Sequence, residues 1–176
     1  MLWLVGRLSG GPDSESRKMV VLTACSCASL ALTCVPEDGR PRVAIEVASA
    51  WAQGESGITM DDVHPAASDA ADAVFDAATA NAANRASPSR AAAYSAASSI
   101  SAATDASCYP SSAVAANSAA SAAHHAAAAA DFGAPNVARD AADDAGEPSA
   151  RRAMLKRCAD IVRERYPTPP RYRKDA

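Results

Sequence analysis

Residues 66–83 read AASDAADAVFDAATANAA, and this composition continues through a tract that holds 36 alanines in the 80 residues from Ala66 to Ala145. Alanine loses no side-chain entropy when it becomes helical, so the tract favours α-helix at nearly every position. A methyl side chain supplies no nucleophile, acid or metal ligand. The tract therefore predicts helical structure and gives little support to an enzymatic role.

Proline residues divide this tract into several helices. Ser87-Pro88, Pro110 and Pro135 interrupt it, because proline lacks the backbone N–H and clashes with the preceding turn. No segment has the alternating β-branched pattern of a strand. The sequence therefore predicts an all-α fold, a closely packed antiparallel array of about six to seven alanine-rich helices. Helices with such small side chains can approach to the short end of the usual interaxial range of about 8 to 10 Å.

Caps and breaks place the first two helices. The first is expected to begin after Asp13 or Ser14 and to extend to about Cys34. It is apolar almost all round, which predicts a central position. The second has Pro41 in its first turn and Gly54 as its stop.

The later helices have more regular faces. The third is expected to begin near His64, because Pro65 is poorly tolerated inside a helix. Its apolar face comprises Val63, Ala67, Ala70, Val74, Ala77 and Ala78, and its opposite face carries Asp69, Asp72 and Asp76. Further helices are expected over 88–108, 111–130 and 136–145. A last helix from Pro148 has an apolar stripe of Met154, Cys158, Ile161 and Val162.

The chain length of 176 residues fits one domain of ordinary size. We expect residues 14–166 to form a single alanine-rich helical domain. Residues 1–13 are expected to be a flexible N-terminal leader, and residues 167–176 a mobile, basic, proline-containing tail.

Five cysteines make an odd number without the regular spacing of a disulfide framework. They are interpreted as small buried hydrophobic residues of a cytoplasmic protein, with Cys25 and Cys27 pointing to different faces of one helix. The longest apolar run, Met19–Val35, is shorter than the roughly 20 residues that span a bilayer, so no membrane partner is expected.

No catalytic, cofactor or metal site is predicted. His124 and His125 are adjacent, so on a helix they diverge by about 100° and do not bind one metal ion together. The chain has no nucleophile elbow, no paired Cys-x-x-Cys motif and no glycine-rich phosphate loop.

One segment resembles a known family. Residues 38–55, DGRPRVAIEVASAWAQGE, resemble the alanine-rich helical immunity proteins of bacterial polymorphic toxin systems, of the immunity-protein-five-like type. The match rests on Arg40, Pro41, Arg42, Glu46, Trp51 and Gly54, and the overall pattern extends over residues 17–166. The resemblance implies a protein that neutralises a toxin by stoichiometric binding, and it carries no catalytic residue.

The charge distribution gives a second indication of function. Net charge is about 0 over residues 1–54, −9 over 55–147 and +6 over 148–176. The acidic segment would attract a basic partner such as a nuclease toxin, with Asp69, Asp72 and Asp76 as the candidate contact. In the alternative interpretation, these aspartates are a solvated face that keeps an alanine-rich surface soluble.

The basic C-terminal segment favours a rival function. Its nine Lys and Arg residues fit a nucleic-acid-associated or regulatory helical protein, although the net charge of −3 argues against a dedicated nucleic-acid binder. A structural protein with no selective partner is the third interpretation, and pairing into a homodimer is compatible with each. The leading hypothesis is a protein toxin as partner.

Overall fold

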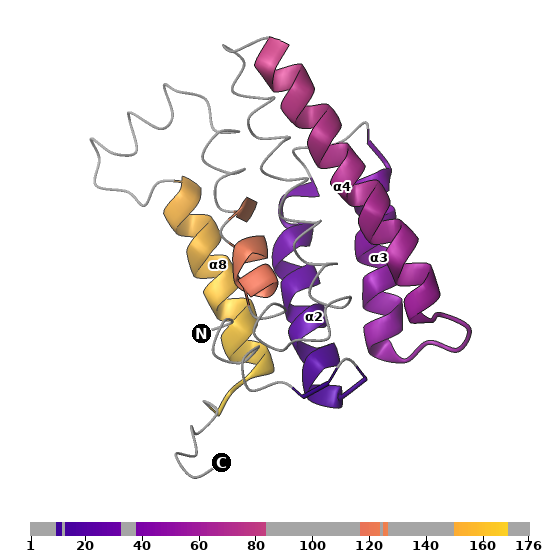
Figure 1. Cartoon of the computed structure of the whole chain (residues 1–176). Coiled ribbons are helices and arrows are strands. Elements are labelled where there is room, and N and C mark those ends of the chain that lie inside the picture. The colour runs from indigo at the N-terminus through magenta and orange to yellow at the C-terminus, as the bar shows by residue number, and fades with distance from the viewer. Residues whose placement is uncertain are drawn as a thin grey trace.

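The computed structural model describes residues 10–11, 13–32, 38–83, 117–123, 125–126 and 150–168 (Figure 1). All regular secondary structure in these ranges is helical, which confirms the all-α class for this part of the chain. The expected helices over 88–108 and 136–145 lie outside the described residues. The helix expected over 111–130 is described only at 117–123 and 125–126, where the chain is helical. The predicted leader and tail also lie mostly outside these ranges.

Helix α2 (Glu15–Ser29) begins where the sequence predicts. The Ser14 side chain accepts a hydrogen bond from the Arg17 backbone N–H at 3.2 Å, which satisfies one of the amides left without a partner at a helix start. The helix ends at Ser29, earlier than the expected Cys34. The next two amides bond to carbonyls three residues back, which tightens the last turn and stops the α-helix. No glycine or proline marks this end in the sequence.

Helix α3 (Arg40–Gln53) has both predicted boundary signals. Pro41 lies in the first turn, where its missing N–H removes no helical hydrogen bond. Gly54 follows the helix in the left-handed conformation at φ 74° and donates its N–H to the Trp51 carbonyl at 3.0 Å. These contacts confirm the expected ends of the second helix.

Helix α4 (Met60–Ala83) begins four residues before the expected start, so the prediction near His64 was wrong. The Asp62 carboxylate accepts hydrogen bonds from the backbone N–H and the hydroxyl of Thr59, each at 2.8 Å. This capping pattern fixes the first turn, and Pro65 is then accommodated inside the helix. Pro65 and Asp61 are both exposed, so solvent can reach the Asp61 carbonyl that proline leaves unbonded.

The described helices pack around α2, which lies between α3 on one side and α8 (Ala150–Arg165) on the other, while α4 returns antiparallel to α3 (Figure 1). The central position predicted for the first helix is therefore confirmed. Of its two neighbours, α3 lies beside Cys25 and α8 lies beside Cys27. None of the described helices is both long enough and apolar enough to cross a bilayer.

The core contains few large side chains. Trp51 is 6 % exposed and is the largest member, and Val162 brings α8 into the same cluster. Most other members are Ala or Cys: Ala24, Cys25, Ala28, Ala44, Ala48, Ala52, Ala66, Ala70, Ala119 and Ala122. A methyl group buries little apolar area, so the stabilisation depends on close approach between helices.

Candidate functional site

The two faces of α4 differ as the sequence predicts. Val63, Ala67 and Ala70 are buried, and Ala66 and Ala73 extend the same inner face. The acidic row, which we define as Asp69, Asp72 and Asp76, is exposed on the outer face. The side chains of Val74, Ala77 and Ala78 lie outside the description.

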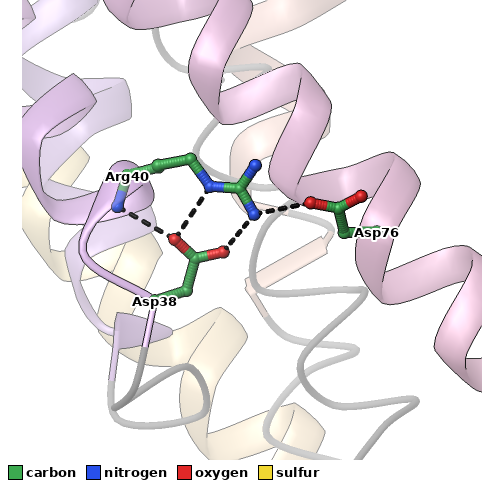
Figure 2. Close-up of polar contacts among 3 residues, drawn as sticks. All are labelled: Asp38, Arg40 and Asp76. Atoms are coloured by element: carbon green, nitrogen blue, oxygen red, sulfur yellow. Dashed lines mark hydrogen bonds and ion pairs between the residues drawn. The ribbon is translucent and has the colours of Figure 1, made fainter.

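The structure separates the acidic row into two parts. Asp76 is bound by Arg40, whose Nη2 lies 2.8 Å from Asp76 Oδ2 (Figure 2). Among the described residues, Asp69 and Asp72 have no hydrogen bond or ion pair. Within the acidic row, Asp69 and Asp72 are therefore the members that have no ion pair with a cation among the described residues.

Arg40 is the centre of a three-residue network that joins the start of α3 to α4 (Figure 2). Its Nε and Nη2 donate to the two Asp38 oxygens at 3.1 and 2.8 Å, and its backbone N–H donates to Asp38 Oδ1 at 3.0 Å. The hydrogen bonds from Arg40 lower the pKa of Asp38, and the two carboxylates raise the pKa of Arg40. The sequence could have indicated the Asp38–Arg40 pair, because an Asp just before a helix start can cap the helix. It gives no signal for the contact between Arg40 and Asp76, which are 36 residues apart.

The residues that carry the family resemblance have mostly structural positions. Pro41 and Trp51 are buried, Gly54 ends α3, and Arg40 holds the network just described. Arg42 and Glu46 are exposed on α3. The segment 38–55 is thus accounted for largely by how it builds and closes one helix.

Three described cysteines are free thiols, and all are buried as predicted: Cys25, Cys27 and Cys158. The Cys25 thiol interacts with Ser49 of α3, whereas the Cys27 thiol interacts with Cys158 of α8. The prediction that the two α2 cysteines point to different faces is confirmed. Cys34 and Cys108 lie outside the described residues.

The α2 and α8 helices also share polar contacts that the sequence did not predict. Arg165 Nη2 donates to Ser26 Oγ at 3.0 Å, so part of the basic C-terminal segment is turned toward α2. The neighbouring Tyr166 hydroxyl is buried beside Thr23 without a hydrogen bond of good geometry, and burial raises its pKa. Thr23 instead donates to the Met19 carbonyl at 2.7 Å.

The described ranges contain no group of three His, Cys, Asp or Glu side chains placed to hold a metal ion. The remaining ionic contacts in these ranges are exposed pairs within one helix, Lys18–Glu15 and Arg163–Asp160.

The chain matches no protein-family model, and no curated protein or solved structure is similar to it.

Proposed function

We propose that this protein is a non-catalytic cytoplasmic binding protein that neutralises a bacterial protein toxin by forming a stoichiometric complex. The observation that carries the proposal is the exposed pair Asp69 and Asp72 on the outer face of α4, which has no ion pair among the described residues. A toxin that acts on nucleic acid has a basic cleft, and an acidic helix face complements such a cleft.

The energetics of the acidic row favour a role in binding. Like charges three or four residues apart on a helix destabilise it by about 0.2 to 0.5 kcal/mol per pair. The helix dipole stabilises acidic groups within the first turn of a helix. Asp69 and Asp72 lie beyond the first turn of α4 and so do not gain this stabilisation. They therefore contribute nothing evident to the fold, in contrast to Asp62, which caps α4, and Asp76, which binds Arg40.

An apolar side chain adjoins this charge. Phe75 lies one turn after Asp72 on α4 and is 72 % exposed. Protein interfaces are enriched in aromatic residues, which supply buried area while the surrounding charges accelerate association. The combination suits a protein partner better than a small ligand.

The test is co-expression with the product of the neighbouring reading frame, followed by purification of the complex. We expect growth rescue and a complex of fixed stoichiometry. Replacing Asp69 and Asp72 together by Asn should weaken rescue and lower the association rate constant about 3- to 10-fold at low salt. Asp76 is left intact, because its loss would also remove the Arg40 contact.

The matched control replaces Asp13 and Glu55 by Asn and Gln. Both are exposed and lie outside the acidic row, so this variant loses the same net charge. It should rescue growth like the wild-type protein. If both variants weakened growth rescue equally, the effect of the acidic row would be one of net charge alone. If no complex formed, the toxin hypothesis would be contradicted.

The basic face of α8 favours a second candidate, a nucleic-acid-associated or regulatory role. Lys156 and Arg157 are exposed there, whereas Arg163 pairs with Asp160 and Arg165 donates to Ser26. Replacing Lys156 and Arg157 by Gln should abolish retention on nucleic acid if this role is correct, and should leave toxin rescue unchanged if the first proposal is correct.

A further inference from the structure

Helices α2 and α8 meet through two thiols that come from opposite ends of the described chain. Cys27 is fully buried and Cys158 is 3 % exposed, and the two thiols lie close enough for each to shift the pKa of the other. The helices pack directly against each other, and the hydrogen bond of 3.0 Å from Arg165 to Ser26, the residue before Cys27, helps to fix their register. The two sulfurs therefore already face each other across one helix interface.

The thiols have unequal acidity. The interaction between the two thiols lowers the pKa of Cys158 and raises the pKa of Cys27. A thiolate is the attacking species in disulfide exchange, so Cys158 is the better nucleophile and Cys27 the thiol that resolves the intermediate. Cys25 lies two residues away on a different face of the same helix, where its thiol interacts with Ser49.

We propose that Cys27 and Cys158 are a reversible dithiol–disulfide site that covalently ties α8 to α2 under oxidising conditions. This inference is independent of the proposed toxin binding. The oxidant is a small-molecule disulfide of the glutathione class. A bond between these positions closes a loop that contains the whole alanine tract, so oxidation restricts the unfolded chain and stabilises the fold.

The exchange balances in two steps. The Cys158 thiolate attacks one sulfur of oxidised glutathione, forms a mixed disulfide and releases one glutathione thiolate. The Cys27 thiol then loses its proton and attacks the Cys158 sulfur, which forms the intramolecular bond and releases the second glutathione thiolate. Two protein thiols are oxidised, one glutathione disulfide is reduced, and two protons pass to the released thiolates or to water.

Burial makes the first step slow. The Cys158 sulfur is covered by the α2–α8 contact, so glutathione reaches it only when α8 transiently separates from α2. Once the mixed disulfide has formed, the return of α8 brings Cys27 back to the reacting sulfur.

The experiment incubates the full reduced chain with oxidised glutathione and maps disulfides by mass spectrometry without reduction, in native buffer and in denaturant. In native buffer, a Cys27–Cys158 link should predominate over every other pairing of the five cysteines, and in denaturant this preference should disappear. The oxidised protein should unfold at a midpoint temperature roughly 5 to 10 °C above that of the reduced protein.

Variants supply the controls. Cys158→Ala and Cys27→Ala should each abolish the link and the rise in midpoint, whereas Cys25→Ala, which changes an equally buried thiol on the same helix, should retain both. The mapping of the wild-type chain does not depend on these variants, so a folding failure leaves the test intact. The proposal is overturned by a persistent mixed disulfide on Cys158, by the same pairing in native and denatured protein, or by native thiols that never react.

Discussion

Helices α2 and α4 use small side chains in different ways. Helix α2 lies between α3 and α8, and eight of its 15 residues are buried. Helix α4 packs on one face only and exposes the acidic row on the other. An enclosed helix is a structural centre with little surface to offer, whereas a helix packed on one face leaves the opposite face available for recognition.

The enclosed helix also places its reactive groups differently. Around α2, each cysteine meets a different neighbour, Ser49 on α3 or Cys158 on α8. On α4, the polar groups either build the helix, as Asp62 does, or face solvent, as Asp69 and Asp72 do. Changes that affect the surroundings of α2 should therefore cost stability, and changes on the outer face of α4 should cost little.

The largest effect is expected at Trp51, which fills the core that the small residues of α2 leave open. Trp51→Ala should lower the free energy of unfolding by about 3 to 5 kcal/mol, measured by urea denaturation. Val43→Ala is the matched control, because Val43 lies on the same helix and is 50 % exposed; it should change stability by less than about 0.5 kcal/mol. Similar losses in both variants would contradict an enclosed core.

A smaller effect is expected from alkaline pH at Cys25. Burial raises the pKa of this thiol from 9.0 to about 11, so its contribution to stability is complete below pH 9 and is lost as the pH rises through 11. The loss should reach about 2 to 3 kcal/mol. A Cys25→Ala variant should be less stable at neutral pH but should lose less between pH 9 and 11, because every other titrating group is shared. Parallel stability curves would show that Cys25 is not shielded from water.

The smallest effect is expected on the outer face of α4. Asp76→Asn removes one ion pair of Arg40, and the exposed fraction of that Asp76 side chain is 63 %, so solvent screening limits the cost to about 0.2 to 1 kcal/mol. Asp69→Asn should leave stability unchanged or slightly increased. High salt should reduce the cost of the Asp76 change.

The pH dependence of stability in acid should test the Arg40 network through its second carboxylate, Asp38. Because Arg40 lowers the pKa of Asp38 below 3.8, the stabilisation by Asp38 is present above that pH and is lost as the pH falls through its folded pKa. Asp38→Asn should therefore destabilise the protein near neutral pH and have no further effect in strong acid. An equal cost at all pH values would mean that the charge of Asp38 is irrelevant.

Local signals in the sequence predicted much of the fold. Ser14, Pro41 and Gly54 lie at the helix ends that their chemistry predicts, and the spacing of apolar residues identified the inner face of α4. The predicted start of α4 was wrong because the rule against Pro65 inside a helix does not hold where the Thr59–Asp62 contacts fix the first turn.

Contacts between distant segments could not be predicted in this way. Periodicity showed that Cys25 and Cys27 face different directions, but it did not identify Ser49 and Cys158 as the side chains that they meet. Likewise, the acidic row was predicted as a unit, and only the fold shows that Arg40 binds Asp76 and leaves Asp69 and Asp72 exposed. Helical spacing specifies a face, and the packing of helices decides what that face contacts.

The central claim is that α4 keeps methyl-sized residues on its inner face because the helices pack closely there, while its outer face is unconstrained. The most direct measurement compares the free energy of unfolding of Ala70→Leu and Ala71→Leu, since Ala70 is fully buried and Ala71 is exposed. Ala70→Leu should lose about 1 to 3 kcal/mol and Ala71→Leu less than about 0.5 kcal/mol. Equal values, or a stabilised Ala70→Leu variant, would contradict the claim.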